Sequence, residues 1–150
     1  MLCQKFLKCE DESKNLVIIF HSANNNGDIS SYILGSKSHW EFEKLNEYLK
    51  TSHHMLFFAD RDNEWYQRDI EHIKNQINSI VKKYSILQIS AIGLSMGGFA
   101  ALLFGSILNF DTVIAFSAQT NITKAFRASY VEKFGTDNLI VYGDTCQTEF

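Results

Sequence analysis

The chain contains no proline among its 150 residues, although proline averages about 5% of residues in proteins. Its turns must therefore use glycine, asparagine, aspartate and serine, as in the run SANNNGDISS at Ser22–Ser31. Long apolar runs are also missing. A membrane-spanning helix needs about 20 apolar residues, and the longest apolar runs of this chain are far shorter. The N-terminal stretch MLCQKFLKCEDESK lacks the continuous apolar segment of a signal peptide. We therefore expect a cytoplasmic protein that does not bind membranes.

Cysteine and clustered positive charge are scarce as well. The three cysteines, Cys3, Cys9 and Cys146, are odd in number and form no Cys-x-x-Cys pair, so we expect reduced thiols rather than a disulfide framework or a zinc ribbon. The net charge is −3 and the basic residues are scattered, which argues against a nucleic-acid partner. Histidines and acids show no metal-ligand spacing such as H-E-x-x-H. The sequence predicts neither a metal nor an organic cofactor.

Short apolar runs predict a sheet. Most of them are continuous rather than alternating, which is typical of parallel strands buried on both faces. Helical patterns lie between them, the clearest being amphipathic. We expect one α/β domain over residues 1–150, a three-layer sandwich with a mostly parallel five-stranded sheet and helices on both faces. The expected strands are Leu16–Phe20, Met55–Ala59, Leu87–Ile92, Thr112–Phe116 and Asn138–Tyr142, with Leu2–Cys9 a candidate edge strand; the expected helices are Phe42–Leu49, Ile70–Tyr84, Met96–Leu108 and Ile122–Phe134.

A serine between glycines stands where the third strand meets a buried helix. Gly93-Leu94-Ser95-Met96-Gly97 matches the nucleophile-elbow pattern G-x-S-x-G. So sharp a turn should hold Ser95 in a strained conformation, with its hydroxyl raised above the sheet, and should leave no room for a side chain at either glycine. The helix that follows would direct its first N–H groups at the same space. The alternative is a glycine-rich turn whose serine only caps the helix.

The segment IGLSMGGFAALLFG, with the strand LVIIFH before it and TVIAFSAQ after it, resembles the α/β-hydrolase superfamily. It is most similar to small serine esterases and related acyl-transferring members, over about Leu16 to Asp144. The resemblance implies the strand order second-first-third-fourth-fifth and ester or thioester chemistry through an acyl-serine at Ser95. It also implies an oxyanion hole made by the N–H of Met96 and that of Ser22 or Ala23.

The same resemblance implies an acid and a histidine after the serine. Asp144, just beyond the fifth strand, is the candidate acid. All five histidines precede Ser95: His21, His39, His53, His54 and His72. The family's last strand and histidine loop would lie beyond Phe150. Three possibilities stay open: a truncated hydrolase without its base, an upstream base, for which His21 is best placed, or a base from another subunit. A homodimer is plausible because a shortened sheet leaves an exposed edge.

Polar and aromatic residues follow the second strand. Asp60, Arg61 and Trp65 would lie at the carboxyl end of the sheet, where open α/β sheets bind ligands. They predict a pocket for a small acyl ester or an acylated sugar; the alternative is an ion pair at Arg61 and a Trp65 that covers the core. A non-catalytic binding or structural module of the same fold is the rival function. A phosphate-binding loop is disfavoured because no lysine follows the glycines.

Overall fold

The structure, a computed structural model, describes residues 2–23 and 40–118. In that part of the chain, five strands form one sheet and short connections join them to a 3-10 turn and three helices. The strands are β1 (Leu2–Leu7), β2 (Asn15–Phe20), β3 (His54–Asp60), β4 (Gln88–Leu94) and β5 (Thr112–Phe116). The turn is η1 (Glu43–Leu45), and the helices are α2 (Asn46–Leu49), α3 (Ile70–Tyr84) and α4 (Met96–Leu108).

The sheet is mixed, with the strand order β1-β3-β2-β4-β5. β3, β2, β4 and β5 are parallel neighbours, in the order that the resemblance implies for the first four core strands. β1 pairs antiparallel with β3, Leu2 lying opposite Asp60. The prediction counted its strands from Leu16–Phe20 and gave the order 2-1-3-4-5. The structure corrects it in one respect: the antiparallel strand β1 forms the edge of the sheet beside β3. The fifth predicted strand, Asn138–Tyr142, and the predicted helix Ile122–Phe134 lie outside the described residues.

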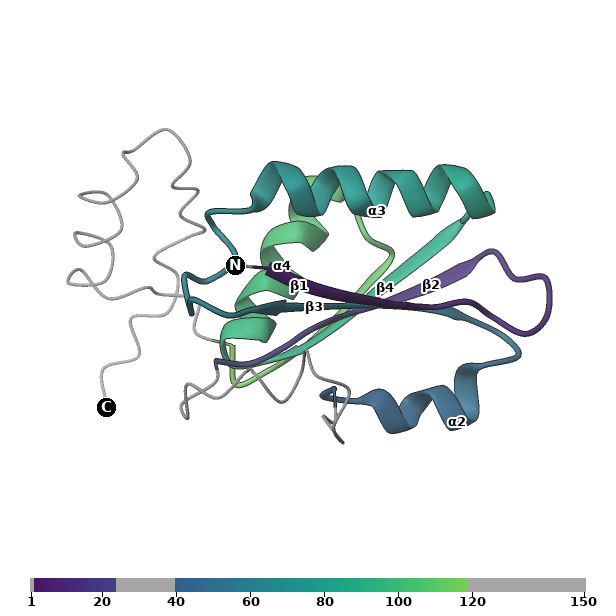
Figure 1. Cartoon of the computed structure of the whole chain (residues 1–150), viewed down its shortest axis with the longest axis horizontal. Helices are drawn as coiled ribbons and strands as arrows, with labels where there is room; N and C mark the ends of the chain where they lie inside the picture. The colour runs from purple at the N-terminus through teal and green to yellow at the C-terminus, as the bar shows by residue number, and fades with distance from the viewer. Residues whose placement is uncertain (1, 24–39, 119–150) are drawn as a thin grey trace.

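Helices cover both faces of the sheet, as Figure 1 shows, with α3 and α4 on one face and α2 on the other. The alternation of β2 explains this arrangement. Leu16, Ile18 and Phe20 belong to the core shared with α3 and α4, whereas Val17 and Ile19 pack with the residues around Trp40. Both faces of the strand are apolar because both are buried.

The two long helices bury different proportions of their surface. α3 is amphipathic and buries Ile70, Ile73 and Ile77, so it lies on the sheet with its charged side in water. α4 is apolar nearly all round and is mostly buried. Within the described ranges, no helix is both long enough and apolar enough to cross a membrane.

Candidate functional site

Ser95 connects β4 to α4 in an unusual backbone conformation. Its φ is 53° and its ψ is −117°, a combination that residues with a Cβ rarely adopt and that costs about 1–3 kcal/mol. Neighbouring hydrogen bonds hold it there: the Ser95 N–H donates to the Phe116 carbonyl at 2.9 Å, and the Ser95 carbonyl accepts from the Phe99 N–H at 3.0 Å. The tight strand-to-helix turn that the sequence predicts is present.

The flanking glycines are required by contact with backbone. A Cβ on Gly93 would lie 2.1 Å from the Gly97 carbonyl oxygen, and one on Gly97 would lie 2.0 Å from the Phe20 carbonyl oxygen. Backbone cannot move aside as a flexible side chain does, so both positions exclude a side chain. The same contact sets the first turn of α4 directly against the end of β2.

The Ser95 side chain is half-buried and makes no capping hydrogen bond to α4. Ser95 is the N-cap residue of α4 by position, but its side chain does not act as the cap. The N–H groups of Met96, Gly97 and Gly98 begin α4 and have no acceptor within the helix. A strained serine thus stands at the positive end of a helix dipole, with a hydroxyl that the helix does not use.

His21 follows β2 and is almost completely buried, with 4% of its surface exposed. Its Nε2 accepts a hydrogen bond from the Glu41 N–H at 3.0 Å, and its ring meets the Trp40 ring edge-on at 4.9 Å. Burial lowers the pKa of His21 to about 4, although Glu41 and Glu43 act in the opposite direction. His21 is therefore neutral at neutral pH, with its Nε2 lone pair engaged.

Ser22, one of the predicted oxyanion donors, is bonded to a carboxylate. Its N–H donates to Oε2 of Glu41 at 3.0 Å, and its hydroxyl donates to Oε1 of the same side chain. Ala23, the other predicted donor, is half-buried against the core beneath α3 and α4. Sequence reasoning does not select Glu41, because the surrounding segment WEFE carries no recognisable motif.

The loop after β3 is organised by its own polar residues. The buried carboxylate of Asp60 accepts from the Asp62 N–H at 3.1 Å and from the Tyr66 N–H at 3.0 Å. Burial raises the pKa of Asp60, and these hydrogen bonds partly oppose that shift. The Tyr66 hydroxyl donates to the His21 carbonyl at 2.8 Å. This loop therefore supports the loop after β2.

Two other residues predicted to line a pocket are only half-buried. The Trp65 ring packs edge-on against Phe99 at 5.6 Å, one helical turn beyond Ser95, so an aromatic side chain lies beside the start of α4. Arg61 stands at the start of the same loop. Asp144, the predicted acid, lies outside the described residues.

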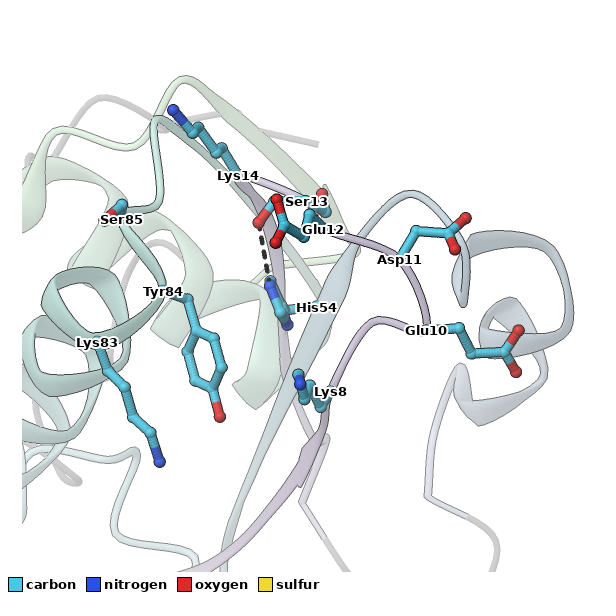
Figure 2. Close-up of a pocket in the computed structure, with 10 residues that line it drawn as sticks. All are labelled: Lys8, Glu10, Asp11, Glu12, Ser13, Lys14, His54, Lys83, Tyr84 and Ser85. Atoms are coloured by element: carbon cyan, nitrogen blue, oxygen red, sulfur yellow. Dashed lines mark hydrogen bonds between the residues drawn. The ribbon is translucent and has the colours of Figure 1, made fainter.

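The histidine at the opposite end of the sheet is also engaged. His54 begins β3, where Nδ1 accepts from the Cys9 N–H at 3.1 Å and Nε2 lies 3.1 Å from the Ser13 carbonyl. It lines a cavity of about 490 Å³ together with Lys83 and Tyr84, and Figure 2 shows these side chains. Parallel strands begin at this end, so the cavity is remote from Ser95. In residues 2–23 and 40–118, no group of three or more potential ligands could hold a metal ion.

Comparison with known proteins assigns no family. No protein-family model matches the chain, and no curated protein matches it. Among solved structures, the chain is similar to MenH from S. aureus with a TM-score of 0.46 and 19% identity, over 86% of this chain and 46% of that one. It thus spans about half the length of that structure, and a similarity of this size assigns no activity.

Proposed function

We propose that the protein is a serine-hydrolase-type member of the α/β-hydrolase superfamily that acts on ester or thioester bonds through an acyl-serine at Ser95. The observation that carries this proposal is the backbone of Ser95, whose φ of 53° and ψ of −117° are kept at an energetic cost. Two glycines that exclude any side chain accompany it. Such strain is concentrated at functional positions because folding alone gains nothing from it.

In the proposed reaction, Ser95 Oγ bonds to the acyl carbon while its proton passes to a base. The carbonyl oxygen becomes anionic, and the Met96 N–H, with that of Ser22 or Ala23, stabilises it. The C–O or C–S bond then breaks, and the alcohol or thiol leaves with a proton. Water, or an acceptor alcohol, reverses these steps to release the acyl group. We assign the acid of the site to Asp144.

The base is the unusual part of the proposal. His21 accepts a hydrogen bond at Nε2 and has a pKa of about 4, so it is poorly suited to take a proton near neutral pH. We therefore assign His21 to supporting the loop. We propose that the base is a residue outside 2–23 and 40–118 or is supplied by the second subunit of a homodimer. If this assignment holds, Ser95 should remain reactive in His21→Gln, because glutamine retains an acceptor for the Glu41 N–H. Loss of reactivity in a folded His21→Gln would make His21 the base.

The proposed substrate is a small acyl ester or an acylated sugar, handled in the cytoplasm without a metal or cofactor. Trp65 supports this choice because its ring packs on Phe99 one turn from the nucleophile. An aromatic face beside the reacting carbonyl suits an acyl chain or the apolar face of a sugar. Arg61, in the same loop, would contact polar groups of the substrate.

A fluorophosphonate probe tests the proposal. Its phosphorus should bond covalently to Ser95 Oγ with loss of fluoride, and Ser95→Ala should abolish the label while circular dichroism shows an intact fold. Ser106→Ala is the matched control, because Ser106 is an exposed serine on the same helix and its loss should leave labelling unchanged. Labelling that survives Ser95→Ala would contradict the proposal.

A non-catalytic binding module is the second candidate. The observation that favours it is that His21 Nε2 and the Ser22 N–H are both already bonded within the protein. If folded wild-type protein takes up no probe over a wide pH range, this second function replaces the first.

A further inference from the structure

We infer that the Glu41 carboxylate is an internal competitor of the substrate: it occupies the Ser22 donor in the resting protein and must leave that donor before the reaction. This inference rests on the proposed function, because it concerns the oxyanion hole of that same site. Glu41 is therefore a residue that controls access to the donor.

The hydrogen bonds show a carboxylate bound as a ligand would be. Both oxygens of Glu41 are used, one by the Ser22 N–H at 3.0 Å and the other by the Ser22 hydroxyl. Hydrogen bonds to a charged oxygen are stronger than those between neutral groups. A loop that binds an anionic oxygen in this way has the donors that a tetrahedral intermediate requires.

The position of this loop connects it to the nucleophile. A Cβ on Gly97 would lie 2.0 Å from the Phe20 carbonyl oxygen and 2.8 Å from the His21 carbonyl carbon. The first turn of α4 therefore rests on the residues that immediately precede Ser22. The anionic oxygen formed during attack by Ser95 and the Glu41 carboxylate would need the same N–H, and one N–H cannot serve both fully.

Glu41 can release the donor without disturbing the backbone around it. Its own N–H is held separately by His21 Nε2 at 3.0 Å, and the neighbouring Trp40 N–H donates to Oε2 of Glu43 at 3.2 Å. The side chain is only half-buried, so rotation about its side-chain bonds moves the carboxylate toward water. The segment stays anchored while the Ser22 N–H becomes available.

The test is the second-order rate constant for fluorophosphonate labelling of Ser95 in Glu41→Ala and Glu41→Gln. Release of a charge-assisted hydrogen bond should raise this rate by about tenfold in Glu41→Ala and by less in Glu41→Gln, which retains one acceptor oxygen. Glu47→Gln is the control, because Glu47 is exposed on α2 and its rate should match that of the wild type. If Glu41→Ala does not fold, Glu41→Gln alone decides.

Sodium acetate supplies a second readout that a purely structural role would not affect. Against sodium chloride at equal ionic strength, acetate should slow labelling of Glu41→Ala because it occupies the vacated Ser22 N–H, and it should leave the wild type unchanged. In NMR spectra, the Ser22 amide signal should shift in Glu41→Ala and return toward its wild-type position with acetate.

The outcomes separate the two proposals. Labelling of wild-type Ser95 together with an equal or slower rate in both Glu41 variants would overturn the competitor role and leave the proposed function intact. An absence of labelling in the wild type and in both variants would overturn both. Faster labelling that acetate reverses supports both.

Discussion

Replacing Ser95 by glycine should stabilise the fold, which is the reverse of what glycine normally does. A residue with a Cβ pays about 1–3 kcal/mol for a conformation of this kind, and the observed φ of 53° with ψ of −117° is such a conformation. Glycine removes that cost but loses about 0.5–1 kcal/mol through the greater freedom of the unfolded chain. We therefore expect Ser95→Gly to exceed Ser95→Ala by about 1 kcal/mol in the free energy of unfolding.

Urea unfolding at equilibrium measures this difference, because both variants lack the hydroxyl and differ only in the Cβ. Ser106, an exposed residue inside α4, supplies the control pair. There Ser106→Gly should be less stable than Ser106→Ala by about 1 kcal/mol, the normal helix preference. If glycine is also the less stable choice at position 95, Ser95 is not strained and the structural basis of the proposed function is lost.

Further predictions concern the supports of the site. Gly97→Ala places a Cβ 2.0 Å from the Phe20 carbonyl oxygen; we expect a loss of more than about 3 kcal/mol or a failure to fold, and a melting temperature within a few degrees of wild type would contradict the contact. The lowered pKa of His21, about 4 against an ordinary 6.5, means that the unfolded chain binds a proton more readily than the folded one. The stability that neutral His21 contributes is complete above pH 6.5 and is lost as the pH falls toward 4. The loss should amount to about 3 kcal/mol relative to His21→Gln, and parallel pH profiles of urea unfolding for the two proteins would refute it. Tyr66→Phe removes the hydroxyl that donates to the His21 carbonyl at 2.8 Å and should cost about 1–2 kcal/mol; an unchanged urea midpoint would show that this hydrogen bond adds no stability.

Local patterns account for the parts of the fold that the sequence predicts. The helices Ile70–Tyr84 and Met96–Leu108 and the strand Thr112–Phe116 have the predicted bounds, because apolar spacing decides them within a single segment. The direction and the pairing partner of the strand Leu2–Leu7 cannot be predicted from local spacing. Its pairing with β3 joins residues more than 45 positions apart, and no spacing within the strand itself specifies such a partner.

In the candidate site, too, some features follow from local sequence and others depend on contacts between distant segments. The turn at Ser95 follows from the steric demands of two nearby glycines, so the sequence displays it directly. The bond between Ser22 and Glu41 spans 19 positions and depends on how two loops meet above the sheet. Proximity of His21 to the strand of Ser95 is predictable from strand order, because β2 and β4 pair. The engagement of its Nε2 depends on the Glu41 N–H and is not predictable in that way.

Direct observation of an acyl-enzyme tests whether Ser95 is the nucleophile. The protein would be mixed with p-nitrophenyl acetate, quenched in acid within the first turnover, and analysed by intact mass and by peptide mapping. We expect one acetyl group on the peptide that contains Ser95, and none in Ser95→Ala. Folded wild-type protein with no acetyl group at Ser95, or the same acetylation in Ser95→Ala, would contradict it.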